Sequence, residues 1–367
     1  MTIYLLGAFL LSMACGFVFT PIILDFCKRK GLYDIPNERK LHKTAVPRLG
    51  GISFMPSMGI AFVVVMLMMN PSISGKDTSI SLWSAYFCIS LAIIYLTGLI
   101  DDLIGLNAKV KFTTQIIAAA LMPMAGLCIN NLYGLFGINE IPYWINAPLT
   151  VFVMVFIMNA INLIDGIDGL AASLSLMALG GFLMAFMREE MPVYCTLIAG
   201  LMGTLIPYLY YNLWGNIEKN RKIFMGDSGS LTLGFVLSFL FVKFASHNPK
   251  VMAFHMDGLL IPYTLLAIPM FDVARVIIYR FRHRKPLFQA DKNHIHHKLM
   301  RSGLTQHKAL LFIIALSIGY ILLNLSLFKV INLTCIFIID IIIYALVNIY
   351  INMMIQHREK TIAYTHE

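Results

Sequence analysis

Charged side chains are scarce in this sequence. Only 13% of its 367 residues are Asp, Glu, Lys or Arg, whereas 59% are hydrophobic and the mean hydropathy is +0.77. A soluble domain has about a quarter charged residues, so the composition excludes an ordinary soluble protein and indicates an integral membrane protein. The net charge of +9 could suggest nucleic acid, but in a membrane protein it more often reports basic cytoplasmic loops. We therefore expect no nucleic-acid partner.

Three further features are missing. The six cysteines form no Cys-x-x-Cys pair, so there is no sign of a disulfide framework or a cysteine zinc site. Short segments of alternating hydrophobicity, typical of outer-membrane barrels, are absent. The first apolar run is followed, not preceded, by the basic stretch 28–30. This order predicts an uncleaved anchor with its N-terminus outside, not a signal peptide.

What the sequence has instead is a series of long apolar runs. A helix needs about 20 apolar residues to span a bilayer, and eleven runs approach or reach this length. We predict eleven spans at residues 3–26, 50–69, 81–100, 112–129, 147–164, 170–187, 193–211, 229–246, 257–279, 308–327 and 331–353.

The basic residues predict the orientation of these spans. With the N-terminus outside, 22 of the 28 Lys and Arg residues lie in the inner segments, as the positive-inside rule requires. This topology places the C-terminus and all of the polar motifs below in the cytoplasm. The fold class predicted is an all-α, polytopic membrane protein of about eleven helices, a single domain over residues 1–367, with one active face on the cytoplasmic side.

The most polar motif is the stretch Asn159–Leu170, NAINLIDGIDGL, which joins two apolar runs. It contains Asn159, Asn162, Asp165 and Asp168, and if the turn is helical the two carboxylates share a face. A polar turn that caps two membrane helices is the alternative. Ionisable groups at a membrane boundary are costly and usually functional, so we interpret this stretch as a site.

Two acidic motifs flank other spans. Asp101 and Asp102 are adjacent, so each disfavours the charge of the other unless a cation compensates, and either a divalent metal ion or Lys109 and Lys111 could do so. Asp227 lies in Met-Gly-Asp-Ser-Gly-Ser just before a span. Asp227 or Ser228 could simply be the N-cap of that helix. Backbone N–H groups at a helix start also favour phosphate, however, and a carboxylate there can hold Mg²⁺.

Two basic segments lie on the same predicted face. In 28–51, Lys43 and Arg48 stand beside Gly50–Gly51, which allow close backbone approach; a positive-inside anchor and an anion contact are equally consistent. In 279–309, three histidines occur within four residues. We favour anion recognition there over zinc, because no clear fourth ligand accompanies the histidines.

Near the inner end of the ninth span, Asp272 and Arg275 have the i,i+3 spacing of a helical ion pair. The last two spans and the tail carry no evident chemistry. We expect them to be structural.

Through several motifs taken together, the chain resembles the polyprenyl-phosphate N-acetylhexosamine-1-phosphate transferases. These are bacterial membrane enzymes that transfer a sugar 1-phosphate from a UDP-sugar to undecaprenyl phosphate. The resemblance extends from about residue 28 to 309, and the family's eleven-span branch agrees with the predicted topology. The motifs occur in the family's order: KTAVPRLGGIS (43–53), GLIDDLIGL (98–106), NAINLIDGIDGL (159–170), FMGDSGS (224–230) and NHIHHKLM (293–300).

The histidine motif indicates the branch. Here it is His-Ile-His-His, as in the branch that uses UDP-GlcNAc for O-antigen, enterobacterial common antigen and teichoic acid linkage units, whereas the phospho-MurNAc-pentapeptide transferases usually carry three consecutive histidines. The branch often places arginine next, and this chain has Lys298, which lacks the bidentate fork. Another UDP-N-acetylsugar or UDP-MurNAc-pentapeptide therefore stays open as the donor.

The resemblance implies roles for individual residues. Asp227 would be the ligand of Mg²⁺ (with Mn²⁺ as a substitute), and Asp102 a second ligand. Asp101 would deprotonate or orient the lipid phosphate, although a monoester with a second pKa of about 6 hardly needs a base. The remaining residues would contact the donor nucleotide, phosphates and sugar: Asp165, Asp168, Asn162, Lys43, His294, His296 and His297.

The expected partners are UDP-GlcNAc, undecaprenyl phosphate and the lipid of the bacterial inner membrane, and a homodimer is compatible with the resemblance. Direct attack of the lipid phosphate and a two-step route through an aspartyl-phosphate both fit. The main rival classes are an ion-coupled transporter, which would not explain the clustering of charge on one face, and a CDP-alcohol phosphotransferase, whose dense aspartate motif is absent.

Overall fold

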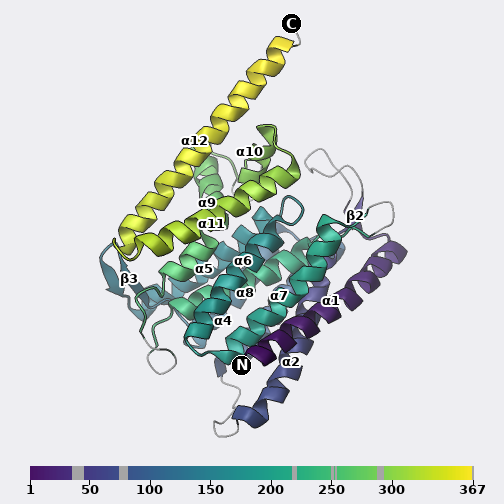
Figure 1. Ribbon diagram of the computed structural model, residues 1–367, viewed down its shortest axis with the longest axis vertical. Coiled ribbons are helices and arrows are strands. Elements are labelled where there is room, and N and C mark those ends of the chain that lie inside the picture. Colours follow the sequence, from purple (N-terminus) through teal and green to yellow (C-terminus); the bar gives the residue numbers. More distant parts are fainter. Residues whose placement is uncertain are drawn as a thin grey trace.

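The structure is a bundle of long helices (Figure 1). The computed structural model describes residues 1–34, 45–73, 82–216, 221–248, 252, 254–286 and 293–365. Two residues near the sequence motifs lie outside these ranges: Lys43, predicted to contact phosphates, and Asp291, which precedes the three histidines.

Each of the eleven predicted spans corresponds to one long helix. The long helices are α1 (Thr2–Lys30), α2 (Phe54–Ile73), α3 (Leu82–Ile104), α4 (Ala108–Met124), α5 (Tyr143–Ile164), α6 (Leu170–Arg188), α7 (Pro192–Leu213), α8 (Gly226–Ala245), α9 (Leu260–Arg282), α11 (Gln306–Leu327) and α12 (Leu333–Thr365). Short helices η1 (Gly50–Ser53) and α10 (Ile295–Arg301) lie between them.

Within the described residues, ten helices are long and apolar enough to cross a membrane, and the chain is a multi-pass membrane protein. The remaining predicted span, 112–129, is α4, which has 17 residues. At 1.5 Å per residue it is about 26 Å long, slightly less than a hydrocarbon core of about 30 Å. The all-α fold is thus confirmed, with α4 as its shortest long helix.

Two small antiparallel hairpins complete the fold. Strands β1 (Tyr33–Asp34) and β2 (Val46–Pro47) pair with each other, as do β3 (Asn131–Leu135) and β4 (Ile138–Glu140). The Asn, Gly and Pro residues of segment 130–146 predict a loop or hairpin there, and the second hairpin confirms this prediction.

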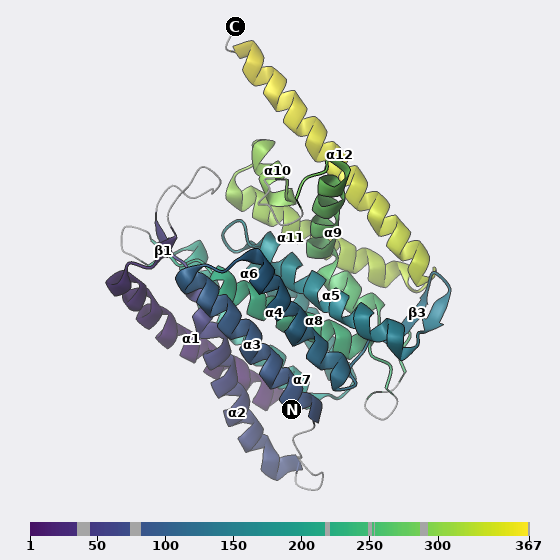
Figure 2. The same ribbon diagram turned by 180° about the vertical axis from the view of Figure 1, so that it is seen from behind.

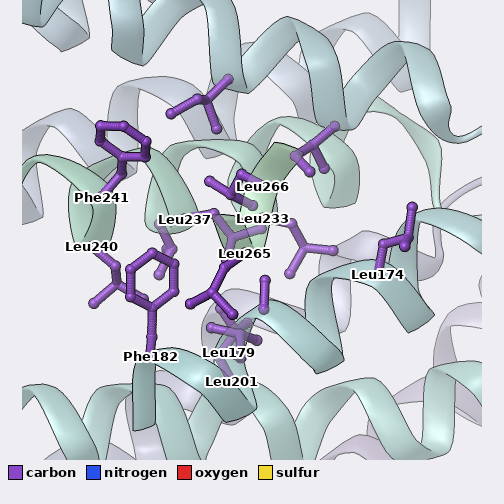
Figure 3. Close-up of a cluster of buried hydrophobic side chains, with 14 of the residues drawn as sticks. Leu174, Leu179, Phe182, Leu201, Leu233, Leu237, Leu240, Phe241, Leu265 and Leu266 are labelled. Carbon is purple, nitrogen blue, oxygen red and sulfur yellow. The ribbon is translucent and has the colours of Figure 1, made fainter. Parts of the chain in front are cut away.

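Helix α8 is the centre of the bundle, because every residue of its apolar window is buried. Figure 3 shows Leu and Phe side chains from α6, α7, α8 and α9 gathered around it. Small residues let its neighbours approach, as is usual between membrane helices: a Cβ at Gly234 would collide with the backbone of Met158 in α5, and Gly51 of η1 lies against Gly229. The central position of α8 places its first residues among the ends of several other helices.

Helices α11 and α12 lie at the outside, where only 28% of each apolar window is buried. Helix α12 runs along the bundle and its C-terminal end projects beyond it (Figures 1 and 2). Most of its surface is therefore available to lipid, yet it carries a few buried polar side chains, among them Asp340, Tyr344 and Asn348.

Candidate active site

Asp102 holds the first turn of α8. Its two carboxylate oxygens accept hydrogen bonds from the backbone N–H groups of Asp227, at 2.8 Å, and Ser228, at 2.9 Å. The side chain is only 3% exposed. Asp102 therefore performs for α8, from the end of α3, the role that an N-cap residue usually performs within its own helix. The alternative prediction that Asp227 or Ser228 caps the helix is wrong: the N-cap is Met225, whose side chain makes no capping bond.

Glycines allow this close approach. Gly226 has φ +71° and a Cβ there would collide with the Asp102 carboxylate. Gly50 and Gly51 donate backbone hydrogen bonds to Phe224 O, at 2.9 Å, and Met225 O, at 2.8 Å. The glycine pair of the first basic segment thus contacts the Asp227 motif, and the expected close approach is confirmed.

Lys111 of α4 joins two of the predicted carboxylates. Its Nζ lies 2.6 Å from Asp227 Oδ2 and 3.2 Å from Asp101 Oδ2. The other oxygen of Asp101 accepts a bond from Leu106 N at 2.7 Å. Of the two compensating lysines considered from the sequence, Lys111 is the one that offsets the charge of Asp101.

Asn162 brings the central polar motif into the same cluster. Its Nδ2 donates to Asp227 Oδ1 at 2.9 Å and to Ser230 Oγ at 2.8 Å. Asn159, one turn earlier on α5, donates to Gln115 of α4 at 2.6 Å. The ends of α3, α4, α5 and α8 therefore meet around Asp227, as the expectation of a single active face requires.

Asp165 and Asp168 do not share a helical face. Helix α5 ends at Ile164 and α6 begins at Leu170, where the predicted spans 147–164 and 170–187 end and begin. Both carboxylates therefore lie in a non-helical turn, and the shared face, which depended on a helical turn, does not form. Gly169 has the left-handed φ of +75°, which interrupts a right-handed helix.

The two carboxylates of this turn have different environments. Asp168 forms an ion pair with Lys222, Nζ to Oδ2 2.6 Å. Asp165 makes no hydrogen bond within the part of the chain that the structure describes. Burial, and then the charges of Asp227, Asp168 and Asp102, raise the pKa of Asp165 to about 7. Lys222 is a site residue that the sequence analysis missed, because only the fold brings its loop to the turn.

The stretch His294–His297, which we call the histidine segment, is held by Asp272 of α9. Asp272 Oδ2 lies 2.7 Å from His294 Nδ1, and its Oδ1 accepts bonds from Ile295 N at 2.9 Å and Arg275 Nη2 at 2.9 Å. The predicted pair of Asp272 with Arg275 is confirmed. The sequence analysis missed its second role as the anchor of this segment, although a carboxylate within a span was a signal of function.

His296 lies against Gly166 of the central polar motif. A Cβ at Gly166 would collide with His296 Nε2, and the His296 ring is 4.2 Å from the His297 ring between centroids. His296 is 1% exposed, and neither of its ring nitrogens has a hydrogen-bond partner among the residues that the structure describes. Burial and the neighbouring His297 lower the pKa of His296 to about 3, so the ring is neutral near pH 7.

The donor set suits a hard cation more than zinc. Among the described residues no three His, Cys, Asp or Glu side chains gather as metal ligands. Mg²⁺, however, is usually bound by one or two carboxylates together with substrate phosphates. Asp101 and Asp227 meet at one positive charge, the Lys111 ammonium, and so present oxygen donors of the right kind, whereas both oxygens of Asp102 are already used by N–H groups.

Comparison with known proteins gives one family. A family model described as glycosyl transferase family 4 matches residues 84–245, which include Asp101, Asp102, Asn162 and Asp227. A Bacillus subtilis protein named probable undecaprenyl-phosphate N-acetylglucosaminyl 1-phosphate transferase is 33% identical over 83% of this chain and 80% of its own.

Two relatives named undecaprenyl-phosphate alpha-N-acetylglucosaminyl 1-phosphate transferase have similar coverage. The Salmonella typhi protein is 31% identical over 81% of this chain and 78% of its own. The Yersinia pestis protein is 29% identical over 85% and 80%. All three relatives are named as glycosyl-1-phosphate transferases. With the family match and relatives of this similarity over most of its length, the chain belongs to glycosyl transferase family 4.

Proposed function

We propose that this protein transfers N-acetylglucosamine 1-phosphate from UDP-GlcNAc to undecaprenyl phosphate, releases UMP, and so starts a lipid-linked cell-envelope polysaccharide such as an O-antigen or capsule. The observation that carries the proposal is the cluster in which Lys111 pairs with Asp101 and Asp227 and Asn162 donates to Asp227. This cluster lies beside the turn that His296 covers. The named relatives support the substrates.

The carboxylate side of the site suits the metal. Asp227 and Asp101 would hold Mg²⁺, which supplies charge neutralisation for the donor pyrophosphate when bound. We assign Asp102 a positioning role instead of the second-ligand role first expected, because its oxygens hold the α8 backbone. Lys111, which balances both acids in the structure, is placed to contact a donor phosphate.

The histidine side of the site suits an anion. Within the described part of the chain, the two ring nitrogens of His296 have no partner, and a neutral imidazole can donate one hydrogen bond and accept one. His297, Arg275 and Lys298 are half-buried around it, a setting that would stabilise phosphate or sugar groups of the donor. Asp165 and Asp168, in the turn below, would contact the nucleotide.

In the reaction proposed, an oxygen of the lipid phosphate attacks the β-phosphorus of UDP-GlcNAc. The new O–P bond forms while the bond from the β-phosphorus to the bridging oxygen breaks, and UMP leaves with that oxygen. Positioning and charge neutralisation dominate such transfers, so Asp101 would orient the attacking phosphate more than deprotonate it. A burst of UMP or a trapped phospho-enzyme would favour the two-step alternative.

We also propose the bacterial inner membrane as the location, with the site on the cytoplasmic side. Its basis is the excess of Lys and Arg in the segments at that end of the helices. Labelling of single cysteines introduced at Lys30 and at Phe136, at opposite ends of the bundle, in intact cells tests the orientation; labelling at Lys30 by an impermeant reagent would contradict it.

The decisive experiment measures UMP release by the purified protein in detergent with Mg²⁺, undecaprenyl phosphate and UDP-GlcNAc. We expect release by the wild type and none by Asp227→Asn or in EDTA. Asp257→Asn is the matched control, because Asp257 pairs with Arg188 at 2.7 Å just before α9 starts, at the end of that helix away from Asp272. It should keep full activity.

Other outcomes separate the alternatives. Release of UMP only from another UDP-N-acetylsugar or from UDP-MurNAc-pentapeptide would keep the reaction and change the donor. No UMP from any donor with folded protein would contradict the proposal. Uptake of a solute into vesicles without chemical conversion would then support the transporter.

A further inference from the structure

The last helix carries a row of buried polar residues that faces the histidine segment. Asp340, Tyr344 and Asn348 are four residues apart, so they lie on one side of α12, and their exposures are 0%, 5% and 6%. The remainder of the helix is largely exposed, as Ile342 and Ile349 are at 52% and 53%. Polar groups buried in a membrane protein are costly unless they are paired, and each residue of this row has a partner.

The first residue of the row attaches α12 to the bundle. Asp340 Oδ2 accepts hydrogen bonds from Tyr263 OH of α9 and Asn324 Nδ2 of α11, both at 2.7 Å. Its backbone oxygen accepts one from Tyr320 OH at 2.9 Å. Three bonds from two helices set the rotation of α12, and thereby the direction in which the next two residues of the row point.

The second residue reaches the anchor of the histidine segment. Tyr344 OH donates to Asp272 Oδ1 at 3.3 Å, and its ring packs against Phe271 with centroids 5.4 Å apart. The same Asp272 oxygen accepts the bond from Ile295 N, and the other oxygen contacts His294. The Asp272 carboxylate therefore links the Tyr344 hydroxyl to the backbone of the histidine segment.

The third residue reaches the segment itself. Asn348 Oδ1 accepts a hydrogen bond from Lys298 Nζ at 3.1 Å, while its Nδ2 donates to Tyr344 O at 3.0 Å. Lys298 directly follows His297 in α10. Burial, and then the charge of Arg275, lower the pKa of Lys298 to about 8, so an acceptor from α12 also helps to keep this lysine charged.

Helix α10 needs such external support. It has seven residues, Ile295–Arg301, and isolated helices shorter than about 12–15 residues are marginal. Farther along α12, Arg358 Nη1 donates to Arg301 O at 2.9 Å. Helix α12 therefore contacts the short helix directly at Lys298 and at its last residue, Arg301. Figure 2 shows α12 running past α9, α10 and α11.

We propose that Tyr344 and Asn348 are positioning residues for the donor: through Asp272 and Lys298 they keep His296 and His297 in place over the Gly166 turn. The inference rests on the proposed function, because it assumes that the histidine segment binds UDP-GlcNAc. It assigns the last helix, expected from the sequence to be merely structural, a part in donor binding that is separate from the lipid acceptor.

The test measures kcat and KM for both substrates in purified Tyr344→Phe and Asn348→Leu. Tyr344→Phe removes the hydrogen bond to Asp272 and Asn348→Leu removes the bonds with Lys298 and Tyr344 O, each with little change in volume. We expect the KM for UDP-GlcNAc to rise about 10-fold, the usual scale for a residue that orients a binding group, with the KM for undecaprenyl phosphate unchanged and kcat within about 2-fold. Asn348→Asp keeps the acceptor for Lys298 and should restore the wild-type KM.

The control is Tyr350→Phe, because Tyr350 lies on the same helix and is 57% exposed; it should have wild-type constants. Wild-type KM values in both Tyr344→Phe and Asn348→Leu would overturn the inference while leaving the proposed function intact. An equal rise in both KM values, or a loss of kcat alone, would also overturn it, since a loosened fold has no preference for one substrate. Failure of the proposed function is distinct, because the wild type itself would then release no UMP.

Discussion

The two halves of the candidate site have opposite charge and are held in different ways. In the carboxylate half, Asp101 and Asp227 share the Lys111 ammonium, and Asp102 accepts the backbone N–H groups of Asp227 and Ser228. In the described part of the histidine half the arrangement is reversed, and one carboxylate, Asp272, contacts His294, Arg275 and the backbone of the segment. A substrate with phosphates and a bound metal ion would match both halves at once.

The way each half is supported also differs. Helix ends meet directly in the carboxylate half, where the end of α3 caps the start of α8 without an intermediate residue. The histidine segment is attached through Asp272 of α9 and Asn348 of α12. We therefore expect changes in the carboxylate half to abolish the reaction, and changes in the histidine half to weaken binding of the donor.

The largest effect is expected from Lys111→Met. Without this ammonium, Asp101 and Asp227 face each other with no cation between them, and like charges at this distance strongly disfavour the ionised pair. UMP release should fall by at least about 100-fold, because charge neutralisation dominates phosphoryl transfer. Lys109→Met is the control, since Lys109 is exposed and should be dispensable. Retained activity in Lys111→Met would mean that the two halves do not differ as described.

A smaller effect is expected from Gly166→Ala in the contact between the halves. The added methyl group must displace His296, so the KM for UDP-GlcNAc should rise by about 10-fold or more. In Gly180→Ala, nothing lies within 4 Å of the new Cβ, and the kinetics should match the wild type. Equal constants for the two variants would show that His296 does not touch the donor.

The pH dependence of stability probes the buried charge of the carboxylate half. The pKa of Asp165 is raised from 3.8 to about 7, so between these values the folded protein keeps a proton that the unfolded chain releases. By linkage, this group lowers the free energy of unfolding as the pH rises from about 4 to about 7.

Asp165→Asn removes this titration. Relative to the wild type, its Tm should gain about 9 °C or more at pH 8 compared with pH 4, because about 3 pKa units correspond to about 4 kcal/mol and Tm shifts by roughly 2–4 °C per kcal/mol. Thermal unfolding in detergent over this pH range measures the difference, and Asp257→Asn is again the control. A Tm difference independent of pH would contradict the raised pKa.

The smallest effect is expected from Arg301→Ala. The Arg301–Glu359 ion pair, 2.6 Å long, is exposed at 64% and 51% of its side chains, and such pairs contribute about 0–1 kcal/mol. Activity should change less than 2-fold, and Tm by about 2 °C or less. A large loss of donor binding would mean that the outer end of α12 supports the histidine half more than the buried row does.

Much of the fold followed from sequence because its causes are local. Each of the eleven apolar runs became one helix, and the hairpin at 131–140 formed where Asn, Gly and Pro predict a turn. The Asp272–Arg275 pair also depends only on helical spacing. The compensation of Asp101 by a nearby lysine was predicted, with Lys111 as one of two options.

Other features had no local cause. Asp102 and Ser228 are 126 residues apart, and neither segment by itself predicts that Asp102 caps the helix that contains Ser228. The ion pair of Asp168 with Lys222 is likewise set by the fold alone, although the break between the helices at 165–169 followed from the ends of the apolar runs. The roles of individual site residues stay predictions until the variants are measured.

By itself the sequence determined that the protein crosses the membrane many times, and that its few charges lie at helix ends, because apolar length and the cost of charge in lipid are properties of each segment alone. Only the tertiary structure decided which charges meet. Whether an acid caps a helix, faces Lys111 or anchors a histidine depends on which helix ends become neighbours, and that depends on how small and large side chains pack around α8.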